Sequence, residues 1–483
     1  MKAAVFTISS NNYYAQAKVL MNSLGEAYPD WDRYFILVDE INAEIWEEDT
    51  AFTKIHFSQL GNANFQKMTF VYDVLELNTA VKPFAIWYFL KEKGYDRVIY
   101  LDPDIYVYRG MDEVEQSFNN GANIIITPHL TKPLIEDGYE PNEMGMLHTG
   151  IYNLGFIAVN NSVESQKAIK WWADRCYELC MDDPDKGLYV DQKWVNYFPS
   201  QYEGVHILKN PGYNVAYWNV SQRKIELKDN NYYINGNPLV FFHFSGTNIE
   251  DKHCFSRHCT RPLGNNEEIV LRLAALYKEK VLDAGYLNYK DIQYAYGVFT
   301  DGRPITRRHR TFFREHKELA EEIGQTPFDK GYIFYDENSI LLRYYDWYAQ
   351  EKRKGMLARI YSSESIVIFG VGANGQKLYS LLKEKGRDKS VKCFCDNSTN
   401  KNMDIFAEIY TPEEAVLKYE DSLYLITPEN YQIEIIGQLL GLGIRPDNIM
   451  IFSVFEIYEI LASEIVWRDY ALSYRQGIQT KDP

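Results

Sequence analysis

Two aspartates separated by one proline are the residues of this chain best placed to bind a cation. Asp102, Pro103 and Asp104 directly follow the apolar run at residues 98–101, which predicts a buried strand. Pro103 cannot donate to a sheet ladder, so we expect the strand to end there. Alternate residues of a strand face the same way, so both carboxylates can address one pocket. Carboxylate oxygens bind divalent cations such as Mn²⁺ or Mg²⁺ and share them with phosphates, although the same pattern also occurs in solvated turns.

The elements around this motif predict an α/β domain. Short apolar runs at residues 3–8, 34–38, 97–101, 123–127, 156–159 and 239–244 predict strands, and residues 81–93 and 162–180 predict helices. Such alternation indicates a mainly parallel sheet, in which ligands gather at the carboxyl ends of the strands. Asp102 and Asp104 would lie at that edge.

The composition bounds the size and class of the protein. A chain of 483 residues is too long for one ordinary core, so we expect two or three domains. The formal net charge of −16 argues against a broad nucleic-acid surface and against adhesion to an anionic membrane. The sequence has neither a run of about 18 apolar residues nor a secretion signal. We therefore expect a cytoplasmic protein without an integral membrane segment, whose six cysteines are reduced.

Six ordered sequence blocks carry a resemblance to a known family. They are ELNTAVKPF at residues 76–84, YDRVIYLDPD at 95–104, GIYNLGFIAVN at 150–160, VDQKWV at 190–195, GYNVAYWN at 212–219 and FHFSG at 242–246. Up to about residue 315 the chain resembles bacterial GT-A-fold glycosyltransferases and, more distantly, glycosyltransferase family 8. The resemblance implies a metal-dependent hexosyltransferase that moves a sugar from a nucleotide-diphosphate donor, such as a UDP-sugar, to a glycan or glycolipid acceptor in polysaccharide biosynthesis.

The resemblance also implies a third metal ligand. His243 and Gly246 have the spacing of the family's His-x-x-Gly turn, and imidazole suits Mn²⁺ better than Mg²⁺. A buried histidine that only makes hydrogen bonds is the alternative. The family continues this turn with a lysine that contacts the diphosphate, and this chain departs from that pattern. Lys252, Arg257 and Arg261 are the candidates to replace it, and we assign Arg257 to the donor site.

Three further residues resemble the family's catalytic groups. Lys82, which precedes Pro83 at a helix start, resembles the basic residue beside the donor phosphates and sugar. Asp191 and Gln192 resemble the Asp-Gln pair that stabilises an oxocarbenium-like centre in retaining members. Asp191 as a helix N-cap is the structural alternative. An inverting mechanism, with Asp191 as the base, stays open.

Fold analogy and the resemblance add further donor contacts. Thr7 and Ile8 end the first predicted strand and Asp39 follows the second, so all three are expected to meet the nucleobase and ribose. Asn153 and Gly155 are expected in a turn that leads into a strand under the donor, where Gly155 permits close backbone approach. Asp102 and Gly246 complete the predicted donor set, and His129 is placed near the acceptor.

The C-terminal part restarts an α/β pattern. We divide the chain into a GT-A domain at 1–262, a helical extension at 263–360, a Rossmann-like domain at 361–465 and a tail at 466–483. A glycine-rich loop, Gly370–Gly375, follows a predicted strand at 366–369 and opens a helix, with Asp396 positioned to hold a ribose. The loop predicts either a nucleotide site or an empty scaffold that contacts other glycan-biosynthesis proteins. An NAD(P)-linked enzyme and a non-catalytic sugar-nucleotide-binding relative are the alternative functions.

Overall fold

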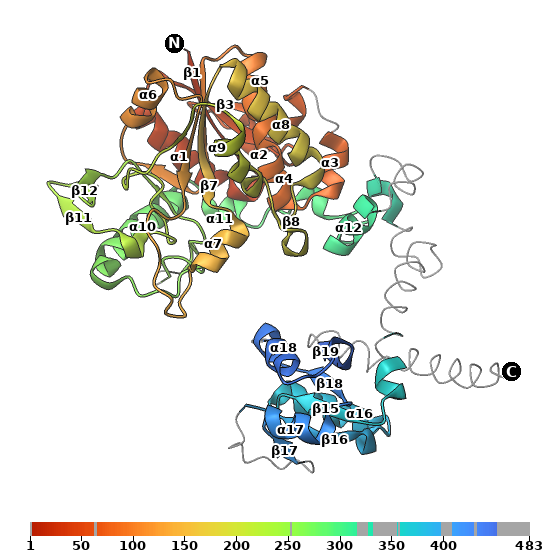
Figure 1. The fold of residues 1–483 in the computed structure, drawn as a ribbon. Helices are drawn as coiled ribbons and strands as arrows, with labels where there is room; N and C mark the ends of the chain where they lie inside the picture. The colour runs from red at the N-terminus through yellow and green to blue at the C-terminus, as the bar shows by residue number, and fades with distance from the viewer. Residues whose placement is uncertain are drawn as a thin grey trace. The chain divides into compact units, whose positions relative to one another are not determined.

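The computed structural model describes residues 2–61, 65–251, 254–315, 327–331, 355, 358–397, 408–428 and 432–451 (Figure 1). The chain forms two compact units, Met1–Gly331 and Tyr332–Pro483. The finer division into four parts stays a prediction. Most of the predicted helical extension after residue 315 and the whole tail at 466–483 lie outside the described residues. Among the described helices, none is long and apolar enough to cross a membrane.

A seven-stranded sheet forms the centre of the first unit, with the strand order β10-β6-β7-β4-β1-β2-β3. Its strands are β1 (Ala3–Ser9), β2 (Asp32–Leu37), β3 (Thr53–His56), β4 (Arg97–Leu101), β6 (Ile124–Pro128), β7 (Tyr152–Asn160) and β10 (Val205–Ile207). Every neighbouring pair is parallel except the two pairs that β7 makes with β4 and β6. The predicted α/β class with a mainly parallel sheet is therefore confirmed.

The first unit also contains the helices that lie beside and below this sheet in Figure 1. They are α1 (Tyr14–Ala27), α2 (Ala43–Glu47), α3 (Phe65–Val71), α4 (Val74–Ala80), α5 (Lys82–Lys91), α6 (Asp112–Asn119), α7 (Glu143–Thr149), α8 (Val163–Leu179), α9 (Phe198–Gln201), α10 (Glu267–Asp283), α11 (Tyr286–Tyr289) and α12 (Arg307–Glu315). The predicted helices at 81–93 and 162–180 correspond to α5 and α8. Val270, Leu273 and Val281 of α10 are buried in the same core as α1, so the start of the predicted extension packs onto the first unit.

A two-stranded sheet brings two distant segments together at the carboxyl end of β4. Strand β5 (Ile105–Val107) pairs antiparallel with β14 (Phe241–His243), and Ile105 lies opposite His243. Asp104 directly precedes β5, and the Asp104 carbonyl accepts a hydrogen bond of 2.9 Å from the Phe244 amide. This register places Asp104 and His243 side by side, although they lie 139 positions apart in the sequence.

The predicted turn at residues 153–156 is wrong, because these residues lie inside β7. Sequence alternation suggested a strand that begins only at Phe156, whereas β7 begins at Tyr152. The pairing of β7 with β6 shifts register between Ile126 and Thr127, and Thr127 then pairs with Asn153. This register shift interrupts the two-residue alternation that a regular strand would show in the sequence, although the residues still belong to the strand. A smaller sheet of β11 (Ile225–Lys228), β12 (Asn231–Ile234) and β13 (Asn237–Pro238) was not predicted.

The second unit contains a five-stranded parallel sheet with the order β17-β16-β15-β18-β19. The strands are β15 (Ile366–Phe369), β16 (Val391–Cys395), β17 (Ile409–Tyr410), β18 (Leu423–Ile426) and β19 (Ile449–Ile451), and the helices are α16 (Ala373–Glu384), α17 (Pro412–Tyr419) and α18 (Gln432–Gly441). The predicted strand at 366–369 is therefore present as β15. In chain order the sheet reads 3-2-1-4-5, the start of the order found in dinucleotide-binding sheets.

Candidate functional site

Asp102, Asp104 and His243 meet at the carboxyl end of β4. The Nε2 atom of His243 lies 3.0 Å from Oδ1 of Asp104 and 3.7 Å from Oδ2 of Asp102. One ligand atom from each of the three residues lies within 4.8 Å of the others. The Asp102 amide donates to the Gly155 carbonyl at 2.8 Å, which anchors the end of β4 to β7. The structure thus brings together the three residues that the sequence proposes as metal ligands.

The chemistry of this donor set fits a divalent cation. Burial lowers the pKa of His243, but the carboxylates of Asp104 and Asp102 outweigh burial, so its pKa is raised above the ordinary value. Two carboxylates facing one imidazole nitrogen therefore attract a positive charge, which a proton or a metal can supply. Oxygen ligands together with one imidazole suit Mn²⁺. Asp102, Asp104 and His243 are the residues that would hold it.

Asn214 fixes the orientation of the His243 ring. Its Nδ2 atom donates to Thr127 Oγ1 at 2.8 Å and to Asn153 Oδ1 at 2.9 Å. The amide oxygen of Asn214 therefore faces Nδ1 of His243, at 3.3 Å, and accepts from it. With Nδ1 protonated, the lone pair of Nε2 is directed at the two carboxylates, as in many metal sites. Sequence reasoning noted the block around Asn214 but assigned this residue no role.

Gly155 is required by the packing of the same ring. A Cβ atom on Gly155 would lie 2.4 Å from Cε1 and 2.7 Å from Nδ1 of His243. Such distances are far below a normal contact, so a larger residue would displace the imidazole. The glycine thus admits the His243 ring, a contact that sequence reasoning did not foresee.

Lys82 and Asp191 form a buried ion pair beside the metal ligands. Nζ of Lys82 lies 2.7 Å from Oδ2 of Asp191, and each side chain is 2% exposed. Lys82 also donates to the Leu154 carbonyl at 2.9 Å, and its ammonium lies 4.4 Å from the ring centroid of Tyr100. Asp191 occupies an N-cap position, but its side chain makes no capping hydrogen bond. Burial raises the pKa of Asp191, and the charge of Lys82 offsets only part of that effect.

Tyr100 connects this pair to the metal ligands, and sequence reasoning missed it. Its hydroxyl donates to Oδ1 of Asp102 at 2.6 Å. Burial and the neighbouring carboxylates raise the pKa of the phenol, so it stays a neutral donor. One carboxylate oxygen of Asp102 is thereby held, while Oδ2 faces His243. The only sequence signal was the alternation that puts Tyr100 and Asp102 on one face of the strand.

The amide of Gln192 is engaged at both ends. Its Oε1 accepts from the Leu154 amide and its Nε2 donates to the Thr149 carbonyl, both at 2.9 Å. Gln192 therefore holds β7 to the end of α7. Next to it, Asn153 donates to Nε2 of His129 at 3.2 Å. Burial lowers the pKa of His129 to about 4, so this histidine is neutral at pH 7.

A cleft with a volume of about 540 Å³ opens over these residues. Among the predicted site residues, those that line it are Ile8, Lys82, Asp102, Asp104, Asn153, Gly155, Asp191, Gln192, His243, Gly246 and Arg257; His129 lines it as well. Thr7 and Asp39 are buried and are not among the lining residues. The Asp39 carboxylate instead accepts from the backbone amides of Ala295 and Asn11, at 2.9 and 3.4 Å.

Among the three candidate cations, only Arg257 is found at the cleft within the described part of the chain. Its amide donates to the Gly246 carbonyl at 3.0 Å, next to the strand that carries His243. Arg261 is paired with Asp137 at 2.5 Å and donates to nearby backbone carbonyls. Lys252 lies outside the described residues.

Two positions of the glycine-rich loop in the second unit require glycine. A Cβ on Gly375 would lie 1.9 Å from the Gly370 carbonyl oxygen, so α16 can approach β15 only with glycine there. Gly370 has a φ of 102°, which also favours glycine. The carboxylate of Asp396 accepts from the Val371 amide at 3.0 Å. Asp396 therefore braces the loop in this structure.

Comparison with known proteins finds relatives over half of the chain. No family model matches. The chain is 28% identical to the uncharacterized protein YfnD of Bacillus subtilis (strain 168) over 248 residues, covering 50% of this chain and 76% of YfnD. It is 26% identical to the uncharacterized protein YfnF of the same organism over 255 residues, covering 52% of this chain and 83% of YfnF.

Two solved structures show a looser similarity. The apo form of mouse xyloside xylosyltransferase 1 is 14% identical, with 50% of this chain and 97% of that chain covered and a TM-score of 0.33. Galactosyltransferase LgtC, in complex with donor and acceptor sugar analogs, is 17% identical, with 58% and 99% covered and a TM-score of 0.34. The geometry of the site, rather than these alignments, carries the function proposed for this chain.

Proposed function

We propose that the first unit is a metal-dependent GT-A glycosyltransferase that uses a nucleotide-diphosphate sugar, with a UDP-sugar as the preferred donor. The observation that supports this proposal most strongly is that Asp102, Asp104 and His243 meet in the cleft at the carboxyl end of β4. The buried ion pair of Lys82 and Asp191 lies beside them. Two carboxylates and an imidazole bind Mn²⁺ or Mg²⁺, and the cleft is large enough for a nucleotide sugar. The ordered sequence blocks support the same reaction.

The leaving diphosphate defines the roles of the charged residues. A divalent cation held by Asp102, Asp104 and His243 would neutralise the negative charge that develops on the diphosphate. Arg257 lines the cleft on the His243 side and is proposed to bind the same phosphates. Lys82 is fixed by Asp191 and Leu154, so its charge requires no reorganisation during transfer.

We propose that transfer retains the anomeric configuration. Asp191 matches the aspartate of the family's Asp-Gln pair, and its carboxylate is fixed by Lys82 beside the metal ligands, where it can stabilise an oxocarbenium-like centre. Gln192 keeps β7 and α7 in place around that centre. The acceptor is proposed to be a glycan or glycolipid of bacterial polysaccharide biosynthesis, and the location to be the cytoplasm.

The C-terminal sheet supports a second, separate proposal. Its strand order and the close packing at Gly375 favour a Rossmann-like domain with a nucleotide at the loop. Calorimetry of the full chain with NAD(H) and NADP(H) tests the NAD(P)-linked alternative. Heat of binding would support it, and no detectable heat would dismiss it.

A thermal-shift screen of nucleotide sugars tests the main proposal. Ligands that bind only the folded state raise the Tm by mass action. We expect a UDP-sugar to raise the Tm in the presence of Mn²⁺ and to lose most of that shift with EDTA. Equal shifts with and without the metal would contradict metal-assisted donor binding. Binding across many donors without turnover on any acceptor would favour the non-catalytic relative.

A further inference from the structure

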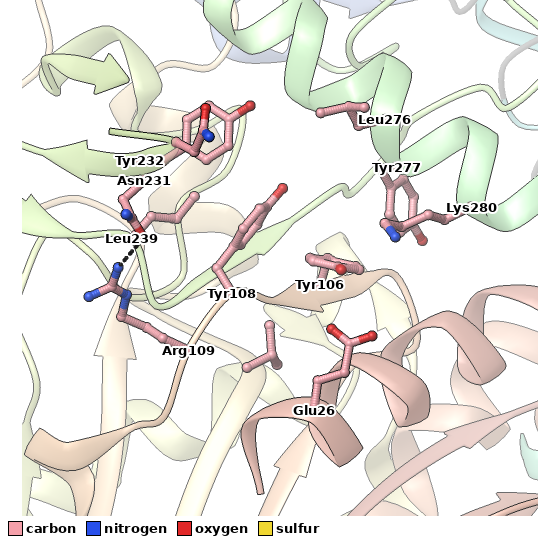
Figure 2. Close-up of a pocket in the computed structure, with 12 residues that line it drawn as sticks. Glu26, Tyr106, Tyr108, Arg109, Asn231, Tyr232, Leu239, Leu276, Tyr277 and Lys280 are labelled. Carbon is pink, nitrogen blue, oxygen red and sulfur yellow. Dashed lines mark hydrogen bonds between the residues drawn. The ribbon is translucent and has the colours of Figure 1, made fainter. Parts of the chain in front are cut away.

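A second pocket in the first unit shares no lining residue with the cleft (Figure 2). It lies between β5, β12 and α10 and has a volume of about 300 Å³, at the lower end of the range for small-molecule sites. Pockets of this size suit one sugar ring better than a nucleotide sugar. The residues that define it come from elements far apart in the sequence, so its shape depends on the tertiary fold.

Three tyrosine rings form one wall of this pocket. Tyr108 lies between Tyr106, at a centroid distance of 4.8 Å, and Tyr232, at 5.8 Å. Figure 2 shows the three side chains together on the pocket lining. Each phenol presents an apolar face with a polar edge, a surface suited to the apolar CH face and the hydroxyl rim of a pyranose.

Polar groups of both charge signs surround the rings. Arg109 donates to the Asn231 side chain at 3.1 Å, and its Nε atom is buried without a hydrogen-bond partner among the described residues. The Lys280 ammonium lies 5.4 Å from the Tyr106 ring centroid, and Glu26 adds a carboxylate to the lining. Sugar hydroxyls both donate and accept, so they can use this mixture. Glu26 offsets part of the positive charge of Arg109 and Lys280, so a neutral sugar fits this lining.

The pocket lies next to the metal ligands, through the start of β5 and through α10. Tyr106 follows Asp104 by two residues on β5. Tyr277 of α10 stacks on Phe244, the residue after His243, at a centroid distance of 4.1 Å and an interplanar angle of 5°. The pocket therefore has a fixed place relative to the cleft within this unit.

We propose that this pocket is a saccharide-binding site, separate from the catalytic cleft, for a neutral pyranose of the glycan that the enzyme extends. The identity of the ligand as part of a glycan rests on the proposed function. The pyranose stacks on the face of Tyr232, Tyr106 and Tyr108 complete the wall edge-to-face, and Arg109 and Asn231 bond to the sugar hydroxyls.

Saturation-transfer NMR on the full chain tests this site. The probes are the methyl α- and β-pyranosides of glucose, galactose and mannose. We expect transfer to at least one of them, and an affinity roughly ten-fold lower in Tyr232→Ala and in Arg109→Gln, because each change removes a stacking face or a donor. Tyr233→Ala is the matched control, since Tyr233 is the next residue of β12 and does not line the pocket.

The outcomes separate this site from the catalytic proposal. Transfer to none of the six probes, or transfer that survives both pocket variants, would overturn the saccharide site. The second result would place the sugar elsewhere, including the cleft. Release of UDP from a UDP-sugar, measured in parallel, reports on the proposed reaction and should be unchanged in Tyr232→Ala. If the wild-type chain releases no UDP from any UDP-sugar, that result would instead count against the proposed function.

Discussion

At the residue scale, the buried pair of Lys82 and Asp191 sets the charge beside the metal ligands. Both side chains are 2% exposed, so neither charge can be screened by solvent. The family resemblance predicts both residues near the donor, but the sequence alone could not show that they pair, because they lie on different elements. The same limit applies to Tyr100 and Asn214, whose roles arise only from contacts made in the fold.

The first prediction concerns the substitution Lys82→Met. Removing the ammonium leaves the buried Asp191 carboxylate without its partner, which costs about 3–5 kcal/mol of unfolding free energy when the remaining charge stays ionised. We expect a large drop in the urea midpoint at pH 8, measured by circular dichroism. The double variant Lys82→Met/Asp191→Asn should recover much of it. Equal stability of the single variant and the wild type would show that the pair is not charged.

The second prediction is that activity and stability vary with pH through the ionisation of Asp191, whose pKa is raised from 3.8 to about 6. The reaction needs the carboxylate ionised, so kcat/KM should fall as the pH drops below about 6. Between pH 3.8 and about pH 6, Asp191 binds a proton more tightly in the folded state than in the unfolded chain. The contribution of Asp191 to the free energy of unfolding therefore decreases as the pH rises through that window. Asp191→Asn should remove both effects. An unchanged acidic limb in pH–rate profiles of this variant, at whatever activity remains, would assign the limb to another group.

At the scale of elements, pairing between strands decides the geometry of the site. The run at residues 98–101 and the proline after it predict where β4 ends, and the structure agrees. The neighbourhood of His243 and Asp104 depends on the pairing of β5 with β14, which no local pattern encodes. The first residues of β7, 152–155, were not predicted as strand because the register shift opposite Asn153 breaks the strand period.

The third prediction is that Gly155→Ala weakens metal binding by displacing His243. The new Cβ would lie 2.4 Å from the imidazole, so the ring must leave its present position beside Asp104. Changes that disturb the support of a metal ligand cost roughly 10–100-fold in affinity. Calorimetry with Mn²⁺ measures this loss. Gly437→Ala in α18 is the control, because a Cβ there would meet no atom within 4 Å. Wild-type affinity in Gly155→Ala would contradict the account of the ring packing.

At the scale of the whole molecule, the two units are compact by themselves, and all the residues proposed for donor chemistry lie in the first. The sequence predicted an α/β pattern in both units because most strands are short apolar runs between helices, but it did not predict β3, β10 or β17. The extent of the first unit was harder to predict. Helix α10 looks like the start of a separate extension in sequence, yet its apolar side packs into the core that it shares with α1.

The fourth prediction is that the second unit is dispensable for donor chemistry. Gly375→Ala puts a Cβ 1.9 Å from the Gly370 carbonyl oxygen and should distort the glycine-rich loop. We expect metal-dependent hydrolysis of a UDP-sugar to stay within about two-fold of the wild type, a change of under 0.5 kcal/mol in barrier. A chain that ends at residue 331 should behave in the same way. Loss of hydrolysis in both variants, with the fold of the first unit intact by circular dichroism, would tie the second unit to catalysis.

The central claim is that Asp102, Asp104 and His243 hold the cation that assists departure of a nucleoside diphosphate. The most direct measurement is the rate of UDP release from UDP-sugars with Mn²⁺, compared between the wild type, Asp104→Asn, His243→Gln and the exposed control Asp30→Asn. The account predicts Mn²⁺-dependent release in the wild type and in Asp30→Asn, and a rate at least ~100-fold lower in the two ligand variants, equal to about 2.7 kcal/mol of transition-state stabilisation. Release that persists at the wild-type rate in both ligand variants, or that is unaffected by EDTA in the wild type, would contradict it.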